Sequence, residues 1–191
     1  MRSKDMSTIS PESVRDAKTA LRRQMKALRA ALSDAERASA AQKLAQAPLP
    51  PTILPPHGGV VAGYWPMKGE IDPLPMMRVL AQQGYRLALP RMTPHGLDFH
   101  LWTPGDLMET GAFGAHEPRA SAPALAPDLI LTPLLAFDEA GGRLGFGKGF
   151  YDRAFAARPE AKRVGLAYAF QRVDAVPGEA HDIPLDAVMV V

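Results

Sequence analysis

The stretch VVAGYWPMKGEIDPLPMMRVLAQQGYRLAL, residues 60–89, decides the fold. It opens on an apolar run of strand length, Val60–Trp65. Apolar residues at helical spacing follow in Leu74–Gln83, which Gly84 ends, and Tyr85–Leu89 is a second apolar run. A strand, a helix and a strand in this order form a βαβ unit, whose strands are parallel. The stretch therefore predicts a parallel sheet with helices on it.

Two helices are expected before this unit. Apolar residues recur three and four positions apart from Val14 to Leu32, and Pro11 suits the first position of that helix. Ser33–Glu36 is a capping-box pattern, which predicts a second helix running to about Ala47. Five prolines in residues 48–57 then indicate a linker along the surface rather than a domain boundary.

Further strands and one short helix are expected after the unit. The predicted strands are Leu97–Trp102, Asp128–Thr132, Val164–Ala169 and Ala187–Val191, and the predicted helix is Tyr151–Ala157. Residues 103–127, rich in Gly, Pro and Ala, should form a long surface excursion. We expect one α/β domain over residues 1–191, a mostly parallel sheet flanked by helices, with residues 1–9 disordered.

Composition and charge exclude several classes of protein. The chain has no cysteine, which excludes disulfides and thiolate chemistry, and it lacks the G-x-S-x-G and H-E-x-x-H patterns of hydrolases and zinc enzymes. It also lacks a signal peptide and an apolar run long enough for a bilayer, so we expect a cytoplasmic protein without membrane contact. Residues 1–43 hold ten Lys/Arg against five Asp/Glu, which favours a local anion site over nucleic-acid binding.

The segment GGRLGFGKGFYDR, residues 141–153, is the strongest candidate site. Its five glycines in nine residues let backbone N–H groups approach an anion, and Lys148 and Arg143 add positive charge. Gly149 follows Lys148 where a P-loop needs a hydroxyl, and Phe150 replaces the third glycine of a dinucleotide fingerprint, so neither motif is present. A flexible turn is the alternative; we favour a site for the phosphates of a nucleoside triphosphate.

Two other loops and one helix face carry candidate residues. Trp65 and Glu70 place an aromatic face beside a carboxylate, which suits a flat heterocycle with N–H donors, although Glu70 could also be a solvated acid in a surface turn. The two carboxylates and the histidine of His181–Asp186, Asp182 among them, could hold magnesium together with Asp152 or could bind a ribose. An Asp before a terminal strand more commonly caps or forms a turn.

Lys18 and Arg22 lie one helical turn apart on a shared face. A solvated basic face is the ordinary interpretation of such a pair. A bound polyphosphate or a substrate carboxylate, which the pair would neutralise, is the alternative.

Residues 143–153 resemble the signature of the 5-formyltetrahydrofolate cyclo-ligases, also called 5,10-methenyltetrahydrofolate synthetases. The resemblance extends over nearly all of the chain after residue 16. It includes Lys18–Arg22, Lys68–Ile71, Leu89–Arg91, Asp128–Pro133 and His181–Asp186.

The resemblance implies a fold similar to the ribose-5-phosphate isomerase and CoA-transferase group. It implies that ATP and Mg²⁺ convert 5-formyltetrahydrofolate to 5,10-methenyltetrahydrofolate, ADP and phosphate, through a phosphorylated formyl oxygen. The partners are then small molecules, with no nucleic acid, and we expect a monomer.

The resemblance also implies roles for individual residues. Lys148 and Arg143 would be catalytic. ATP would contact Lys18, Arg22, Arg143, Leu144, Gly145, Phe146, Gly147, Lys148, Gly149, Phe150 and Tyr151. The folate would contact Trp65, Glu70, Phe146, Gly147, Lys148, Gly149 and Phe150. Asp152 and Asp182 would hold the magnesium.

Two residues depart from the family pattern. Phe146 stands where the family usually has Tyr or Arg, and Phe150 where it has Tyr, so one hydroxyl group is missing. A paralogue that binds nucleotide or folate without turnover is therefore an alternative. An RNA-binding module, suggested only by the basic residues 1–43, is another.

Overall fold

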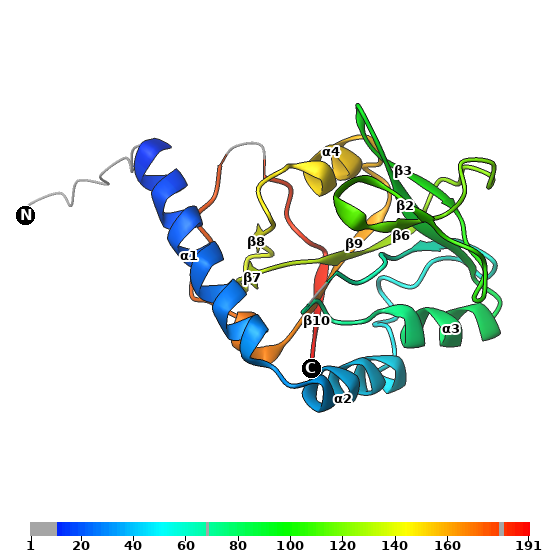
Figure 1. Ribbon diagram of the computed structural model, residues 1–191, viewed down its shortest axis with the longest axis horizontal. Helices are drawn as coiled ribbons and strands as arrows, with labels where there is room; N and C mark the ends of the chain where they lie inside the picture. Colours follow the sequence, from blue (N-terminus) through cyan, green and yellow to red (C-terminus); the bar gives the residue numbers. More distant parts are fainter. Residues whose placement is uncertain (1–10, 68, 180–181) are drawn as a thin grey trace, which may run out of the picture.

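A computed structural model describes residues 11–67, 69–179 and 182–191. The predictions made for residues 1–9, Lys68 and His181 lie outside these ranges. The central sheet has the strand order β10-β9-β6-β1-β2-β3, and all neighbouring strands are parallel except β2 and β3 (Figure 1). In chain order the strands are β1 (Val60–Ala62), β2 (Arg86–Thr93), β3 (Gly96–Leu101), β6 (Leu129–Pro133), β9 (Lys162–Ala167) and β10 (Ala187–Val190). The predicted α/β class with a mostly parallel sheet is confirmed.

Both faces of the sheet are buried, which explains why its inner strands are continuous apolar runs. In β6, Leu129 and Leu131 face the apolar cluster that includes residues of α2 (Asp34–Gln46) and α3 (Leu74–Gln82). Ile130, between them, faces the opposite cluster, to which α4 (Phe150–Ala156) contributes. This alternation is the period of two that a strand imposes on its side chains.

The predicted helices and strands appear with shifts of a few residues at their ends. Ser33 caps α2 as expected, with its Oγ accepting from the Glu36 N–H at 3.2 Å and the Glu36 carboxylate accepting from the Ser33 N–H at 2.8 Å. The predicted strand Val60–Trp65 ends at Ala62, because Gly63, Tyr64 and Trp65 already belong to the loop that enters the site.

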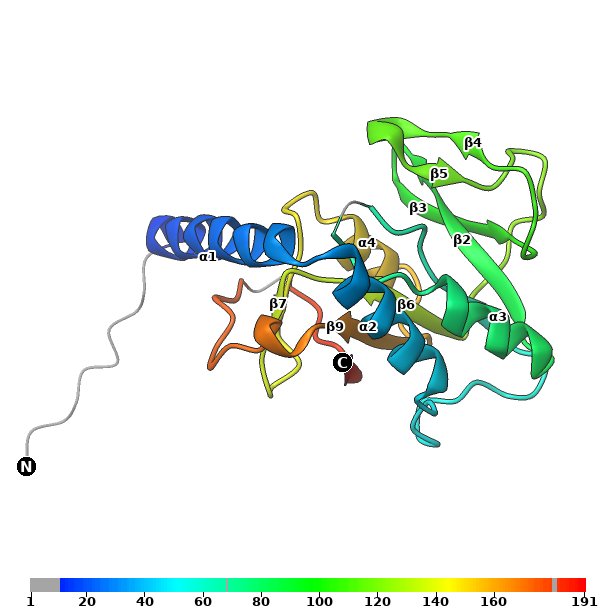
Figure 2. The same ribbon diagram turned by 60° about the horizontal axis from the view of Figure 1, so that its bottom comes forward.

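The excursion at residues 103–127 holds structure that the composition did not predict. It contains β4 (Glu109–Thr110) and β5 (His116–Glu117), an antiparallel pair joined by the 3-10 turn Ala112–Gly114. Arg91 of β2 holds this pair in place, since it donates to the Glu109 carboxylate at 2.8 Å. The excursion is thus folded against the edge of the sheet (Figure 2).

Helix α1 (Pro11–Ala31) lies beside a second small hairpin, away from α3, and its C-terminal end leads into α2 (Figures 1 and 2). The hairpin consists of β7 (Ala136–Phe137) and β8 (Arg143–Leu144), and η2 (Ala169–Gln171) follows β9. Met25 of α1 packs on Leu135, Ala136 and Leu144. This packing brings the basic helix alongside the glycine-rich segment.

In the part of the chain that the structure describes, no helix has the length and apolar character needed to cross a membrane.

Candidate active site

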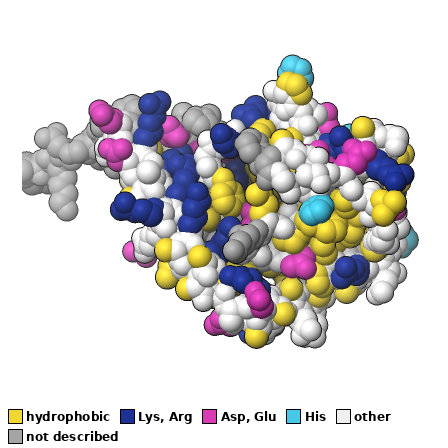
Figure 3. All heavy atoms as spheres, in the orientation of Figure 1, with side chains coloured by type: hydrophobic (Ala, Val, Ile, Leu, Met, Phe, Trp, Pro, Cys, Tyr) yellow, Lys and Arg dark blue, Asp and Glu magenta, His cyan; other side chains and the backbone are white. Residues whose placement is uncertain are grey.

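A cavity of about 560 Å³ lies between α1, the loop after β1, strands β2 and β3, and the glycine-rich segment (Figure 3). This volume is typical of sites for small organic ligands. Every candidate residue named from the sequence lines it: Lys18, Arg22, Trp65, Glu70, residues 143–152 and Asp182. The structure therefore brings together residues that stand as far as 164 positions apart in the chain.

Arg143 is held rigidly at one end of this cavity. Its Nη2 donates to the Asp152 carboxylate at 2.8 Å, and its guanidinium lies over the rings of Tyr151 and Phe155 at 5.7 and 5.4 Å. The Nε–H group of Arg143 is buried without an acceptor among the described residues. A buried donor on a cation is costly to leave unsatisfied, so this atom favours an anionic ligand.

Lys18 of α1 lies at the same end of the cavity. Its ammonium group is 2.7 Å from both the Glu179 and the Asp182 carboxylates, and its side chain is only 7% exposed. Burial alone lowers the pKa of Lys18, but the hydrogen bonds to Asp182 and Glu179 outweigh it, so the pKa is raised. Lys18 therefore stays charged at neutral pH.

The glycine-rich segment is shaped by glycine backbone conformations and by Asp138. Gly147 and Gly149 have φ values of +93° and +63°, which side chains disfavour. The Asp138 carboxylate accepts from the N–H groups of Ala140, Gly142 and Val176 at 3.0, 2.8 and 2.8 Å. Asp138 thus fixes the turn that leads into the segment.

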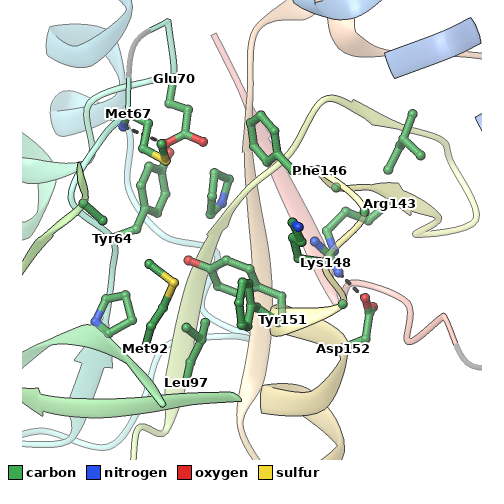
Figure 4. A pocket seen from close by; sticks show the side chains of 18 of the residues that line it. Tyr64, Met67, Glu70, Met92, Leu97, Arg143, Phe146, Lys148, Tyr151 and Asp152 are labelled. Atoms are coloured by element: carbon green, nitrogen blue, oxygen red, sulfur yellow. Dashed lines mark hydrogen bonds and ion pairs between the residues drawn. The ribbon is translucent and has the colours of Figure 1, made fainter. Parts of the chain in front are cut away.

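The opposite end of the cavity is largely apolar. Tyr64, Met92 and Leu97 form its walls, and Glu70 faces it from the loop after β1, across from Arg143 and Lys148 (Figure 4). Beside this wall, Trp65 packs against the rings of Trp102 and His116, with centroids 6.5 and 5.1 Å away.

Glu70 is a buried carboxylate with few partners. It is 8% exposed, and its Oε2 accepts from the Met67 N–H at 2.9 Å. Burial raises the pKa of Glu70, while the Met67 N–H and the charge of Arg29 act in the opposite direction. Burial also raises the pKa of Tyr151 well beyond its ordinary range, so its hydroxyl stays protonated. This end therefore offers an acceptor within apolar and aromatic walls.

The acidic residues of the cavity do not form a preassembled metal centre. Among the described residues, no three His, Asp or Glu side chains are grouped as metal ligands. Asp152 pairs with Arg143, and Asp182 pairs with Lys18. Each carboxylate is therefore placed at the basic end, next to a cation.

The model of the 5-formyltetrahydrofolate cyclo-ligase family matches residues 14–191. The chain belongs to this family. The ATP-dependent cyclisation that the resemblance implied is the activity of the family, so the chain is a ligase of this class. The cavity is its candidate active site.

Individual relatives agree with the family model. A 5-formyltetrahydrofolate cyclo-ligase of Escherichia coli strain K12 is 36% identical over 149 residues, covering 73% of this chain and 80% of the relative. One from Haemophilus influenzae is 36% identical over 139 residues, covering 68% and 74%. The solved structure of Aquifex aeolicus 5,10-methenyltetrahydrofolate synthetase superposes with a TM-score of 0.76 at 34% identity, covering 91% of this chain and 89% of that one.

Sequence reasoning missed several cavity residues. Glu179 and Arg29 line the cavity, and Glu117 of β5 does so from the folded excursion. Arg29 had a detectable signal, because it lies seven residues after Arg22 and so falls on the same helical face. Glu179 and Glu117 had none, since their positions depend on contacts with distant parts of the chain.

Proposed function

We propose that the cavity binds ATP at its basic end and 5-formyltetrahydrofolate at its apolar end, and passes the γ-phosphoryl group to the formyl oxygen. That oxygen attacks the γ-phosphorus, and ADP leaves. The N10 nitrogen then attacks the formyl carbon and loses its proton, and phosphate departs with the oxygen. The products are 5,10-methenyltetrahydrofolate, ADP and phosphate. Phosphorylation is needed because an amide oxygen is otherwise a poor leaving group.

The division of one cavity into two unlike ends is the observation that supports this proposal most. Cations from two distant parts of the chain, Lys18, Arg22, Arg143 and Lys148, gather at one end. At the other end, aromatic and apolar groups surround the Glu70 carboxylate and the Arg29 guanidinium. Polyphosphate needs the first environment and a flat heterocycle with N–H donors needs the second.

The lining of the cavity supports a role of the glycine-rich segment in the transfer. Residues 146–150 line the cavity, and Phe146 and Lys148 lie between Glu70 and Arg143 in Figure 4. The role we assign to Lys148 and Arg143 is to neutralise charge on the phosphoryl group in flight. Such a transfer needs alignment and electrostatic stabilisation rather than a covalent nucleophile.

The contacts of the two substrates follow from this division. We assign Glu70 to the N–H groups of the pterin and Trp65 to an aromatic contact with the folate. For ATP, Lys18 and Arg22 complete the basic wall that residues 143–151 begin.

Magnesium belongs to the same proposal, with Asp152 and Asp182 as its protein ligands. Mg²⁺ usually keeps several waters and is held by one or two carboxylates together with substrate phosphates. Two carboxylates beside a phosphate site, each paired with a cation, fit this mode, whereas a group of three acidic side chains would suit a permanently bound ion. When bound, the metal supplies positive charge that the phosphate oxygens share with Lys148 and Arg143.

An action as a monomer in the cytoplasm, without a nucleic-acid partner, completes the proposal. Size-exclusion chromatography with light scattering tests the oligomeric state directly.

One assay tests the reaction. Purified protein, 5-formyltetrahydrofolate, ATP and Mg²⁺ should give the methenyl chromophore in step with ADP, and omission of ATP should abolish it. Binding of both ligands without product would favour a paralogue that has lost turnover. Binding of RNA with a steep dependence on salt, together with no binding of ATP, would favour the nucleic-acid module instead.

A further inference from the structure

Arg29, near the C-terminal end of α1, is a buried cation at the apolar end of the cavity. The whole residue is 6% exposed, although it lies on a surface helix of basic character. Burial lowers its pKa, and the charge of Glu70 opposes this shift. Guanidinium groups are rarely buried, and here burial places the positive charge of Arg29 in the wall of the cavity, where a ligand can meet it.

Two walls of the cavity hold Arg29 in place. Its guanidinium lies over the ring of Phe146 in the glycine-rich segment, with Cζ 5.2 Å from the ring centroid. On another side it packs on Gly69, where a side-chain Cβ would come within 3.3 Å of Arg29 Nε. Gly69 is bonded to Glu70, so Arg29 is fixed beside the carboxylate that we assign to the pterin.

Other cations of the cavity are fixed elsewhere. Lys18 is held by Glu179 and Asp182, Arg22 donates to the Gly145 carbonyl at 2.9 Å, and Arg143 is held by Asp152. Among the described residues, Arg29 is the cation whose charge acts on Glu70. Glu70 and Arg29 thus present an anion and a cation next to each other in an apolar surrounding.

The edge of a pterin ring has the complementary pattern. The 2-amino group and N3–H are donors, which suit a carboxylate, and the adjacent 4-oxo group is an acceptor, which suits a guanidinium donor. Resting on the proposed function, we propose that Arg29 determines substrate specificity by donating a hydrogen bond to the 4-oxo group of the pterin, while Glu70 accepts from its N–H groups.

The consequence is discrimination against pterins that carry an amino group at position 4. Such a ring would turn a donor toward the Arg29 guanidinium and leave both buried groups without a partner. Sites built to hydrogen-bond one group reject analogues that lack it much more strongly than apolar pockets do.

Affinities for two ligands test the proposal: 5-formyltetrahydrofolate and its 4-amino-4-deoxy analogue. Each is measured by calorimetry with the whole protein and with the variants Arg29→Met and Arg29→Lys. Methionine keeps an unbranched apolar side chain in place of the arginine stem and removes every donor. Arg23→Met, an exposed arginine on the same helix, is the matched control.

We expect the unaltered protein and the control to prefer the 4-oxo ligand. Arg29→Met should reduce that preference about 10- to 100-fold, as expected for loss of a hydrogen bond from a charged donor. Arg29→Lys should restore part of it. Thermal melting of each variant separates a folding defect from a change in specificity.

Two results would overturn the assignment of Arg29. One is an equal loss of affinity for both ligands with the preference unchanged, which would make Arg29 a structural residue. The other is an unaltered affinity for both. If the unaltered protein bound neither ligand, the proposed function itself would fail, and this result is distinct from the other two.

Discussion

Arg22 Nε donates a hydrogen bond of 2.9 Å to the carbonyl oxygen of Gly145, which joins the N-terminal helix to the glycine-rich segment. Lys18, one turn earlier, is joined to the loop that carries Asp182. The basic end of the cavity is therefore assembled from three parts of the chain that are far apart in sequence. Changes at any of them should be felt first in ATP binding and phosphoryl transfer.

Replacement of Lys148 tests phosphoryl transfer. We expect Lys148→Ala to lower kcat more than tenfold, because a cation on the transferring group acts mainly in the transition state. ATP affinity should fall less than kcat. Steady-state kinetics with separate ATP titrations measure both.

Lys43→Ala removes an exposed lysine from α2 and is the control, with kcat expected to stay unchanged. An unchanged kcat in Lys148→Ala would show that Lys148 has only a structural role.

Glu70 should make folate affinity depend on pH. Burial raises its pKa above the ordinary 4.5, and only the ionised form offers both oxygens as acceptors to the pterin N–H groups. Affinity should therefore be full above the raised pKa and fall as the pH drops through it. The pKa of Glu70 is higher in the folded protein than in the unfolded chain, so protonation of Glu70 stabilises the fold. As the pH falls through the raised pKa, the contribution of Glu70 to the free energy of unfolding therefore grows while the folate affinity falls.

Glu70→Gln removes the titrating group, so this variant should bind folate weakly and with a flatter pH profile. Calorimetric titrations over a pH series check the expectation. Retention of the pH dependence in Glu70→Gln, or weakened ATP binding with intact folate affinity, would contradict the assignment of Glu70 to the pterin.

Asp138 should contribute substantially to the stability of the protein. It is 9% exposed, and its carboxylate accepts from three backbone N–H groups. Asp138→Ala would remove the acceptor of three partly buried hydrogen bonds, which should lower the free energy of unfolding by about 3 kcal/mol. Urea denaturation measures this loss.

Asp106→Ala is a suitable comparison, since Asp106 is exposed and accepts from the Thr103 N–H in a surface turn. The free energy of unfolding should fall by less than about 1 kcal/mol in Asp106→Ala. Equal losses in the two variants would refute the structural role of Asp138.

The sequence predicted the central sheet well because strands that are buried on both faces consist of consecutive apolar residues. Runs such as Leu129–Leu131 are apolar at every position, and a βαβ order fixes their direction. The lining of the candidate site was predicted beyond the glycine-rich segment, because the resemblance also named Lys18, Arg22, Trp65, Glu70 and Asp182. The finer likeness to the ribose-5-phosphate isomerase group and the individual residue roles remain predictions.

Contacts between residues far apart in the sequence could not be predicted. The partner of Lys18, Glu179, stands 161 residues away, and no local pattern connects the two. Likewise, β7 and β8 have two residues each, too few for a periodic signal to exist. Asp138 reads as an ordinary turn residue until the structure places three N–H groups around it.

Gly147 gives the sharpest test of the glycine-rich segment, because strain and crowding can be separated there. Its φ of +93° is unfavourable for any side chain, and a Cβ would lie 3.2 Å from Cζ of Arg22. Gly147→Ala should therefore lower the free energy of unfolding by about 1–3 kcal/mol. It should also displace Arg22 and weaken ATP binding.

Gly105→Ala supplies the matched comparison, because Gly105 has a φ of +102° in the surface excursion and nothing within 4 Å of an added Cβ. The Gly105→Ala substitution imposes similar backbone strain without crowding the site. We expect a comparable loss of stability and unchanged ATP affinity in Gly105→Ala, measured by urea denaturation and calorimetry. If both variants weakened ATP binding equally, strain alone would account for the effect, and the contact between Gly147 and Arg22 would have no part in holding the nucleotide.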